Sequence, residues 1–145
     1  MERPQSAQRI LAWLFLLGAT LQFFLAGLAV FRAKPHGSEK LFHSSAFDAH
    51  RVLGDALILI AFALLVLAIV NREHVRLALV LFVLMLVQFG LAEAGHSIAA
   101  LGALHPVNGV LLLMISHILT RGPRAKGSQE RQPEPQGAEE PVAAE

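Results

Sequence analysis

The chain has 145 residues, of which 54% are hydrophobic and only 16% are charged. Soluble proteins average about 25% charged residues, so this composition indicates a membrane protein with room for a single domain. The formal net charge of +1 argues against nucleic acid as a partner, because that role requires a basic face. The lack of cysteine excludes disulfides, thiolate metal sites and covalent c-type haem.

Four apolar stretches follow one another along the chain, separated by charged or turn-rich segments. A bilayer core about 30 Å thick requires about 20 helical residues, and lipid leaves only helices and closed barrels as spanning structures. The sequence lacks the alternation of a barrel strand. It therefore predicts an all-α fold, a membrane-embedded four-helix bundle with up-down-up-down topology within residues 1–120. The predicted spans are residues 10–31, 50–70, 77–95 and 105–120.

The basic residues are divided unevenly between the two sides of this predicted bundle. Eight Lys and Arg residues lie on the side of the termini and four lie on the other side. The positive-inside rule places the richer side in the cytoplasm. We therefore expect a multi-pass protein of the bacterial cytoplasmic membrane with both termini in the cytoplasm. Residues 121–145 contain four prolines, many charges and no aromatic residue, which predicts a disordered cytoplasmic tail.

Two short patterns, Gln-Phe and His-x-x-x-Gly, each occur once in each half of the predicted bundle. They fall at Gln22-Phe23 and Gln88-Phe89, and at His50–Gly54 and His105–Gly109. A repeated pair of spans keeps its orientation, so the two copies would be related by an axis along the membrane normal. The patterns predict two tandem helical hairpins, with the two histidines at equivalent depth near the outer face.

These histidines are the strongest candidates for binding a cofactor. His50 and Gly54 share one helix face, as do His105 and Gly109, because positions i and i+4 stack on a helix. An imidazole beside a bare backbone suits a flat ligand, and paired imidazoles hold haem iron in the cores of helical bundles. We predict one b-type haem between His50 and His105, serving electron transfer or redox sensing. The protein would then act with a membrane redox partner or as a homo-oligomer.

Arg51 lies between Asp48 and Asp55, at spacings that place all three residues on one helical stripe. A charge in the middle of the bilayer costs about 2.5–3.5 kcal/mol on insertion scales, so we expect Asp55 to be paired or protonated. Two interpretations follow for Arg51. It either binds a haem propionate or neutralises the two acids beside it.

Two alternatives to haem binding remain open, and catalysis is not favoured by any motif. Small residues also permit close helix packing in membranes without a ligand, so the chain could be a non-catalytic subunit or scaffold. Such a protein needs neither histidine to face the bundle axis. An outer-face copper or zinc handling protein would instead need His36, His43 or His96 to converge with the pair, since imidazole suits both metals.

One segment resembles a known haem protein family. Residues 47–54, Phe-Asp-Ala-His-Arg-Val-Leu-Gly, are similar to the start of the second helix in each four-helix half of heme A synthase. The resemblance implies haem ligands at His50 and at His105, which stands where that family has a second ligand histidine. The chain offers only one such half, and Asp48 replaces a differently spaced glutamate. Overall, the chain looks still more like small four-span bacterial membrane proteins grouped in families of unknown function.

Overall fold

The structure, a computed structural model, describes residues 3–32 and 45–121. Within these ranges the chain forms four α-helices and no strand. The helices are α1 (Arg3–Arg32), α3 (Ser45–Asn71), α4 (Val75–Gly95) and α5 (Ala99–Thr120). Each helix is long and apolar enough to cross a membrane, which confirms the predicted all-α fold class. The predicted tail, beyond Arg121, lies outside the described residues.

The fourth helix begins earlier than the sequence predicts. α5 starts at Ala99, six residues before the predicted start of the span. Ile98 has an extended backbone, with φ −129° and ψ 99°, and ends the turn that follows α4. The residues after it include alanine and leucine, which have the highest helix propensities. Local propensity therefore extends the helix beyond the strongly apolar run.

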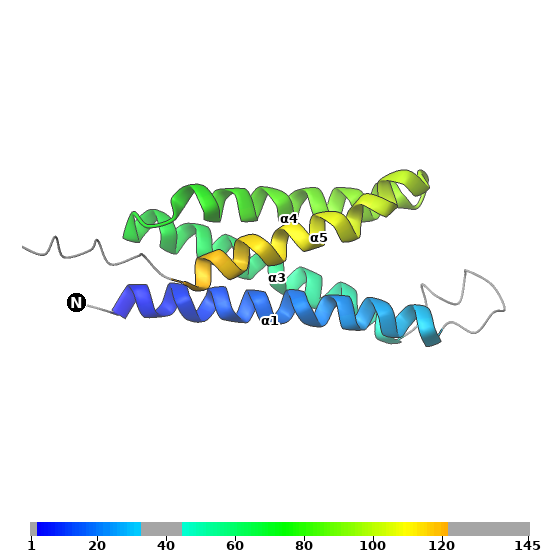
Figure 1. Ribbon diagram of the computed structural model, residues 1–145, viewed down its shortest axis with the longest axis horizontal. Coiled ribbons are helices and arrows are strands. Elements are labelled where there is room, and N and C mark those ends of the chain that lie inside the picture. The colour runs from blue at the N-terminus through cyan, green and yellow to red at the C-terminus, as the bar shows by residue number, and fades with distance from the viewer. Residues whose placement is uncertain (1–2, 33–44, 122–145) are drawn as a thin grey trace, which may run out of the picture.

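The helices form a four-cornered bundle in which consecutive helices run in opposite directions (Figure 1). α1 packs against α3 and α5, and α4 packs against the same two helices. The pair α1 and α4 therefore lies on one diagonal of the bundle, and α3 and α5 lie on the other. Short turns at residues 72–74 and 96–98 join α3 to α4 and α4 to α5.

The core of the bundle is narrow and rich in small residues. Lipid tails are as apolar as leucine, so helices in a membrane associate mainly through close packing. Large apolar side chains such as Leu59 and Phe62 accordingly remain on the outer surface. The core residues recur every three or four positions on each helix. They are Ala12, Phe15, Ala19, Leu57, Ala61, Leu64, Leu81, Met85, Leu112 and Leu119.

The backbones of α4 and α5 approach one another closely beside the turn that joins them. A Cβ atom added to Gly95 would lie only 2.7 Å from the Cα atom of Gly102. Only glycine allows two backbones to meet at this separation. The contact fixes how α5 leaves the turn, and His105 follows Gly102 by about one helical turn.

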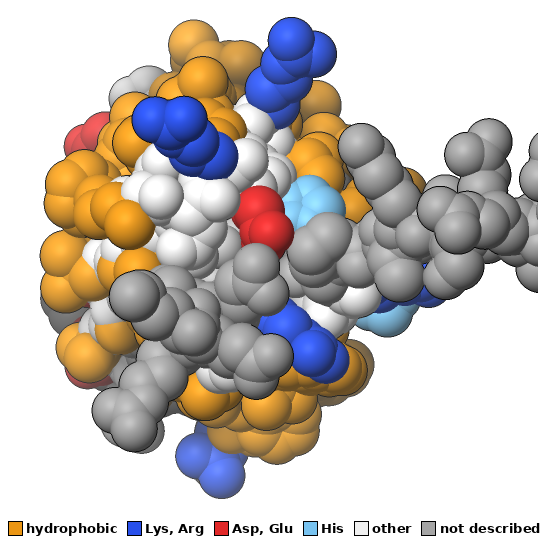
Figure 2. Space-filling view, turned by 90° about the vertical axis from the view of Figure 1, so that its left-hand side faces the viewer, with side chains coloured by type: hydrophobic (Ala, Val, Ile, Leu, Met, Phe, Trp, Pro, Cys, Tyr) orange, Lys and Arg blue, Asp and Glu red, His pale blue; other side chains and the backbone are white. Residues whose placement is uncertain are grey.

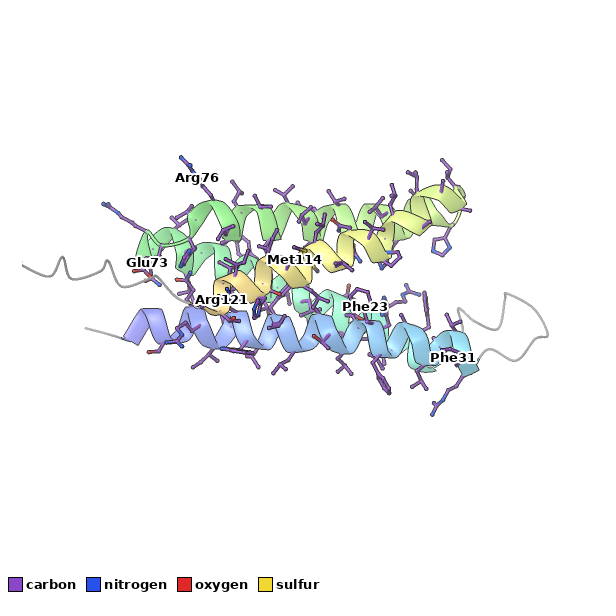
Figure 3. All side chains as sticks on the ribbon, in the orientation of Figure 1. Phe23, Phe31, Glu73, Arg76, Met114 and Arg121 are labelled. Atoms are coloured by element: carbon purple, nitrogen blue, oxygen red, sulfur yellow. The ribbon has the colours of Figure 1, made fainter. Side chains whose placement is uncertain are left out.

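Polar side chains gather at the end of the bundle where α1 begins. Figure 2 views this end and shows Arg side chains around its rim, with apolar side chains on the flanks. Arg76 and Arg121 are labelled at the same end in Figure 3. The buried Gln8 accepts a hydrogen bond from Asn71 Nδ2 at 3.0 Å and donates one to the carbonyl of Glu73 at 3.4 Å. These bonds join α1 to the end of α3.

Candidate functional site

The structure brings together the two histidines that the sequence singles out. His50 on α3 and His105 on α5 approach one another from diagonally opposite helices. Their ring centroids lie 6.3 Å apart, and the ring planes are tilted by 51°. Both residues are half-buried. The pair therefore lies between the helices of the bundle and does not face outward into lipid.

Each histidine is held by the same kind of hydrogen bond. His50 Nδ1 lies 3.2 Å from the backbone carbonyl oxygen of Gln22, and His105 Nδ1 lies 3.1 Å from that of Gln88. A carbonyl oxygen only accepts, so each Nδ1 carries the hydrogen and donates it. The lone pair of each ring then resides on Nε2. Histidines that ligate metals are oriented in this way, by a hydrogen bond from the ring nitrogen that does not bind the metal.

The two glycines of the His-x-x-x-Gly patterns lie beside side chains from neighbouring helices. A Cβ atom on Gly54 would lie 3.1 Å from Gln22 Nε2, and one on Gly109 would lie 3.0 Å from Phe23 Cζ. Figure 3 labels Phe23 on α1, on the side that faces α5. The bare backbone that the sequence predicts is present, but these side chains fill the space beside it. Close packing explains this, because an empty gap would lose dispersion contacts.

A buried polar network surrounds His105. Asn108 is only 6% exposed, and its Nδ2 donates to the carbonyl of Leu84 at 2.9 Å and to Gln88 Oε1 at 2.6 Å. Gln88 Nε2 in turn donates to His105 Nε2 at 3.1 Å. Sequence reasoning did not identify Asn108. The available signal was an amide side chain within an apolar span, three residues after His105 and therefore on its face.

The surroundings of His50 differ. Leu53 occupies the position that corresponds to Asn108 when the two His-x-x-x-Gly patterns are aligned. Gln22 Oε1 is buried and accepts no hydrogen bond from the described residues. In the described part of the chain, the only hydrogen bond of the His50 ring is the one to the Gln22 carbonyl. Phe47 stacks on the His50 ring at a centroid distance of 6.0 Å and an interplanar angle of 19°.

The charged residues near the pair are all exposed. Arg51, Asp48 and Asp55 lie on the outer surface of α3, and Glu93 lies on that of α4. They are therefore outside the space between the two histidines. Both roles considered for Arg51, binding a propionate and neutralising the two acids, stay predictions.

A metal site built from protein ligands alone is not formed by the described residues. Residues 3–32 and 45–121 contain no group of three or more His, Cys, Asp or Glu side chains that could hold a metal ion. A zinc site requires three or four protein ligands. His96 is exposed, while His36 and His43 lie outside the described residues. The hypothesis of a copper or zinc site therefore depends on those two loop histidines.

Comparison with known proteins identifies a family. The model of a family of unknown function (DUF6220) matches residues 22–95, about half of the chain. The matched stretch begins at Gln22, contains His50 and Gln88, and ends before α5 and His105. No curated protein and no solved structure matches the chain.

Proposed function

The chain belongs to this family of unknown function, and we propose that it is an integral membrane protein that binds one b-type haem between His50 and His105. The observation that carries the proposal is the 6.3 Å separation of the two ring centroids. Iron held by two imidazoles places the ring centres about 6 Å apart, because each metal–nitrogen bond is about 2 Å and each nitrogen lies about 1 Å from its ring centre.

The number of protein ligands also favours haem over a free metal ion. A porphyrin supplies four nitrogen ligands, so two histidines complete the coordination of its iron. When bound, the haem supplies a one-electron couple, which suits electron transfer or redox sensing with a membrane partner or a second copy of the chain. His50 and His105 would hold the iron, and the carbonyls of Gln22 and Gln88 would orient the two rings. The apolar helices around the pair would exclude water.

A bound macrocycle would displace the side chains that lie beside the two glycines. α1 and α4 lie on the other diagonal of the bundle, and no Cα atom of one lies within 8 Å of a Cα atom of the other. The groups that fill the glycine faces are the ring end of Phe23 and the amide end of Gln22. Phe23 and Phe89 are each 39% exposed, so both rings can turn outward into lipid. Arg51, at the rim, is a candidate partner for a propionate.

A non-catalytic scaffold is the second candidate function, and one observation favours it. The network of His105, Gln88 and Asn108 already satisfies its own hydrogen-bonding groups without a ligand. Such a network could serve only to join α4 to α5. In that case the two histidines would tie helices together and bind no iron.

A visible spectrum separates the two candidates. Wild-type protein, produced with an adequate haem supply, should show the sharp reduced-minus-oxidised band of low-spin haem. His50→Ala and His105→Ala should each abolish that low-spin band. His117→Ala is the matched control, because this residue lies about 18 Å further along α5 and its Nε2 accepts a hydrogen bond from Arg121. The absence of a band from well-folded wild-type protein would leave the scaffold as the function.

We also propose that the end of the bundle where α1 begins faces the cytoplasm of a bacterium. The exposed Arg9, Arg72, Arg76 and Arg121 all lie at this end, whereas Arg32 and Arg51 lie toward the other. A reporter that is active only in the cytoplasm, fused after Glu145, should be active. An inactive reporter on a stably expressed fusion would reverse this topology.

The two hairpins are further proposed to be copies of one unit. The support is the recurrence of the same bond, from histidine Nδ1 to a glutamine carbonyl, in each hairpin. Superposition of one hairpin on the other should require rotation about an axis near the membrane normal. It should also place Gln22 within one helical turn of Gln88, and a larger offset would rule out duplication.

A further inference from the structure

We infer that the two histidines are unequal as ligands, an inference that rests on the haem proposed above. His50 is the permanent ligand, and His105 is the exchangeable one. A small neutral molecule that binds reduced iron, with carbon monoxide as the probe, would take the position of His105. The inference comes from the hydrogen bonds around the two Nε2 atoms, which differ between the two hairpins.

The lone pair of His105 already has a partner in the protein. Gln88 Nε2 donates a hydrogen bond to His105 Nε2 at 3.1 Å, and iron requires the same lone pair. One nitrogen lone pair cannot serve both partners. Binding of iron to His105 would therefore break a partly buried hydrogen bond, which weakens this ligand relative to one without a competitor.

Asn108 prevents Gln88 from turning aside. Its Nδ2 donates to Gln88 Oε1 at 2.6 Å, which fixes the amide with its NH₂ group toward His105. If Gln88 rotated away, the Nδ2 donor of Asn108, a residue only 6% exposed, would lose this acceptor. Unsatisfied buried polar groups are costly in an apolar environment. The amide of Gln88 is consequently positioned to donate a hydrogen bond to His105 Nε2 whenever this nitrogen is not bound to iron.

His50 faces no such competitor. Its Nδ1 is held by the Gln22 carbonyl, and no described residue donates to its Nε2. The residue that corresponds to Asn108 is Leu53, which has no donor to orient the side chain of Gln22. Phe47 stacks on the ring and helps to hold it in place. The His50 imidazole is therefore oriented for coordination and free to remain bound.

The exchange itself is a substitution of one neutral ligand by another. In the haem-loaded protein, carbon monoxide would replace His105 Nε2 as a ligand, one neutral donor for another, with no change in oxidation state. The imidazole leaves neutral because Nδ1 keeps its proton for the Gln88 carbonyl. Its Nε2 then recovers the hydrogen bond from Gln88, which offsets part of the lost coordination.

Carbon monoxide titration of the reduced protein tests the inference. Wild type should bind carbon monoxide with a shift of the visible bands. Asn108→Leu releases Gln88, so His105 should stay on the iron and the affinity for carbon monoxide should fall about tenfold, the equivalent of one hydrogen bond. Gln88→Leu removes the competing donor directly but keeps the backbone carbonyl, and it should give the same loss. Leu53→Asn is the matched change in the first hairpin and should not weaken binding.

Haem retention gives a second readout. His105→Ala should keep a five-coordinate haem through purification, whereas His50→Ala should lose it. If wild type has no haem band, the proposed function fails. If the haem band is present but does not respond to carbon monoxide, the inference fails and the function stands. The inference also fails if both Asn108→Leu and Gln88→Leu, or whichever of them folds, bind carbon monoxide as tightly as wild type.

Discussion

The two hairpins of the bundle hold their histidines by the same hydrogen bond to a backbone carbonyl. They differ in the residue one helical turn after each histidine. In the second hairpin, Asn108 orients Gln88, and Gln88 occupies His105 Nε2. In the first hairpin, Leu53 stands in the place of Asn108, and no residue in the described part of the chain donates to His50 Nε2. In an apolar interior, a single amide therefore decides whether a histidine nitrogen is available to a ligand.

At the end of the bundle opposite the start of α1, the two hairpins have connections of different length. The first uses residues 33–44 to connect its helices, whereas the second uses only residues 96–98. The short turn brings the backbones of Gly95 and Gly102 into direct contact. Short connections fix the direction of the following helix more tightly than long ones, so the position of His105 depends on these glycines.

The largest effect should come from the glycine contact in the second hairpin. Gly95→Ala places a Cβ atom 2.7 Å from the backbone of Gly102, so α4 and α5 must separate. Overpacking of this kind costs about 1–3 kcal/mol, and no flexible side chain is present to relieve it. Thermal unfolding in detergent should show the loss. Gly90→Ala is the control, because nothing lies within 4 Å of its added Cβ. Equal stability of the two variants would contradict the proposed contact.

An intermediate effect should follow from making the second hairpin resemble the first. Asn108→Leu keeps a side chain branched at Cγ but removes the donor to Gln88 Oε1 and to the Leu84 carbonyl. We expect a loss of about 1 kcal/mol in unfolding free energy for each of these two hydrogen bonds, the usual net value. The reverse change, Leu53→Asn, offers a donor to the unpartnered Gln22 Oε1 and should cost less. Unfolding in the same detergent gives the ranking, and a larger cost for Leu53→Asn would contradict the hydrogen-bonding difference between the two hairpins.

The smallest effects should separate the two glycines beside the histidines. Gly109→Ala would press against the rigid ring of Phe23, and Gly54→Ala would press against the flexible amide of Gln22. Alanine favours a helix over glycine by about 1 kcal/mol, which should balance the cost at Gly54 but not at Gly109. The predicted order is a small destabilisation for Gly109→Ala and almost none for Gly54→Ala. Adding Phe23→Ala to Gly109→Ala should remove the difference, and if it persists the ring is not its cause.

Much of the fold and part of the site follow from local patterns in the sequence. Hydropathy is a property of consecutive residues, so four spans could be recognised before any packing was known. The spacing of His50 and Gly54, repeated at His105 and Gly109, depends only on helical periodicity. The sequence leaves two alternatives for residues 98–104, an extension of the fourth span or a re-entrant turn, because that segment is helical by propensity but less apolar than the rest of the span. The start of α5 at Ala99 decides for the extension.

The sequence by itself determined the four apolar helices and the helix face on which His50 and His105 each lie. It also paired these two histidines as candidate haem ligands. Only the tertiary structure decided which groups complete the site. A glutamine carbonyl meets a histidine on the next helix only when the two helices pack in one particular register. The same register fills the glycine faces with Gln22 and Phe23 and lets Asn108 reach Gln88. Such contacts join residues 17 or more positions apart, and their geometry depends on the crossing of whole helices, which no local pattern encodes.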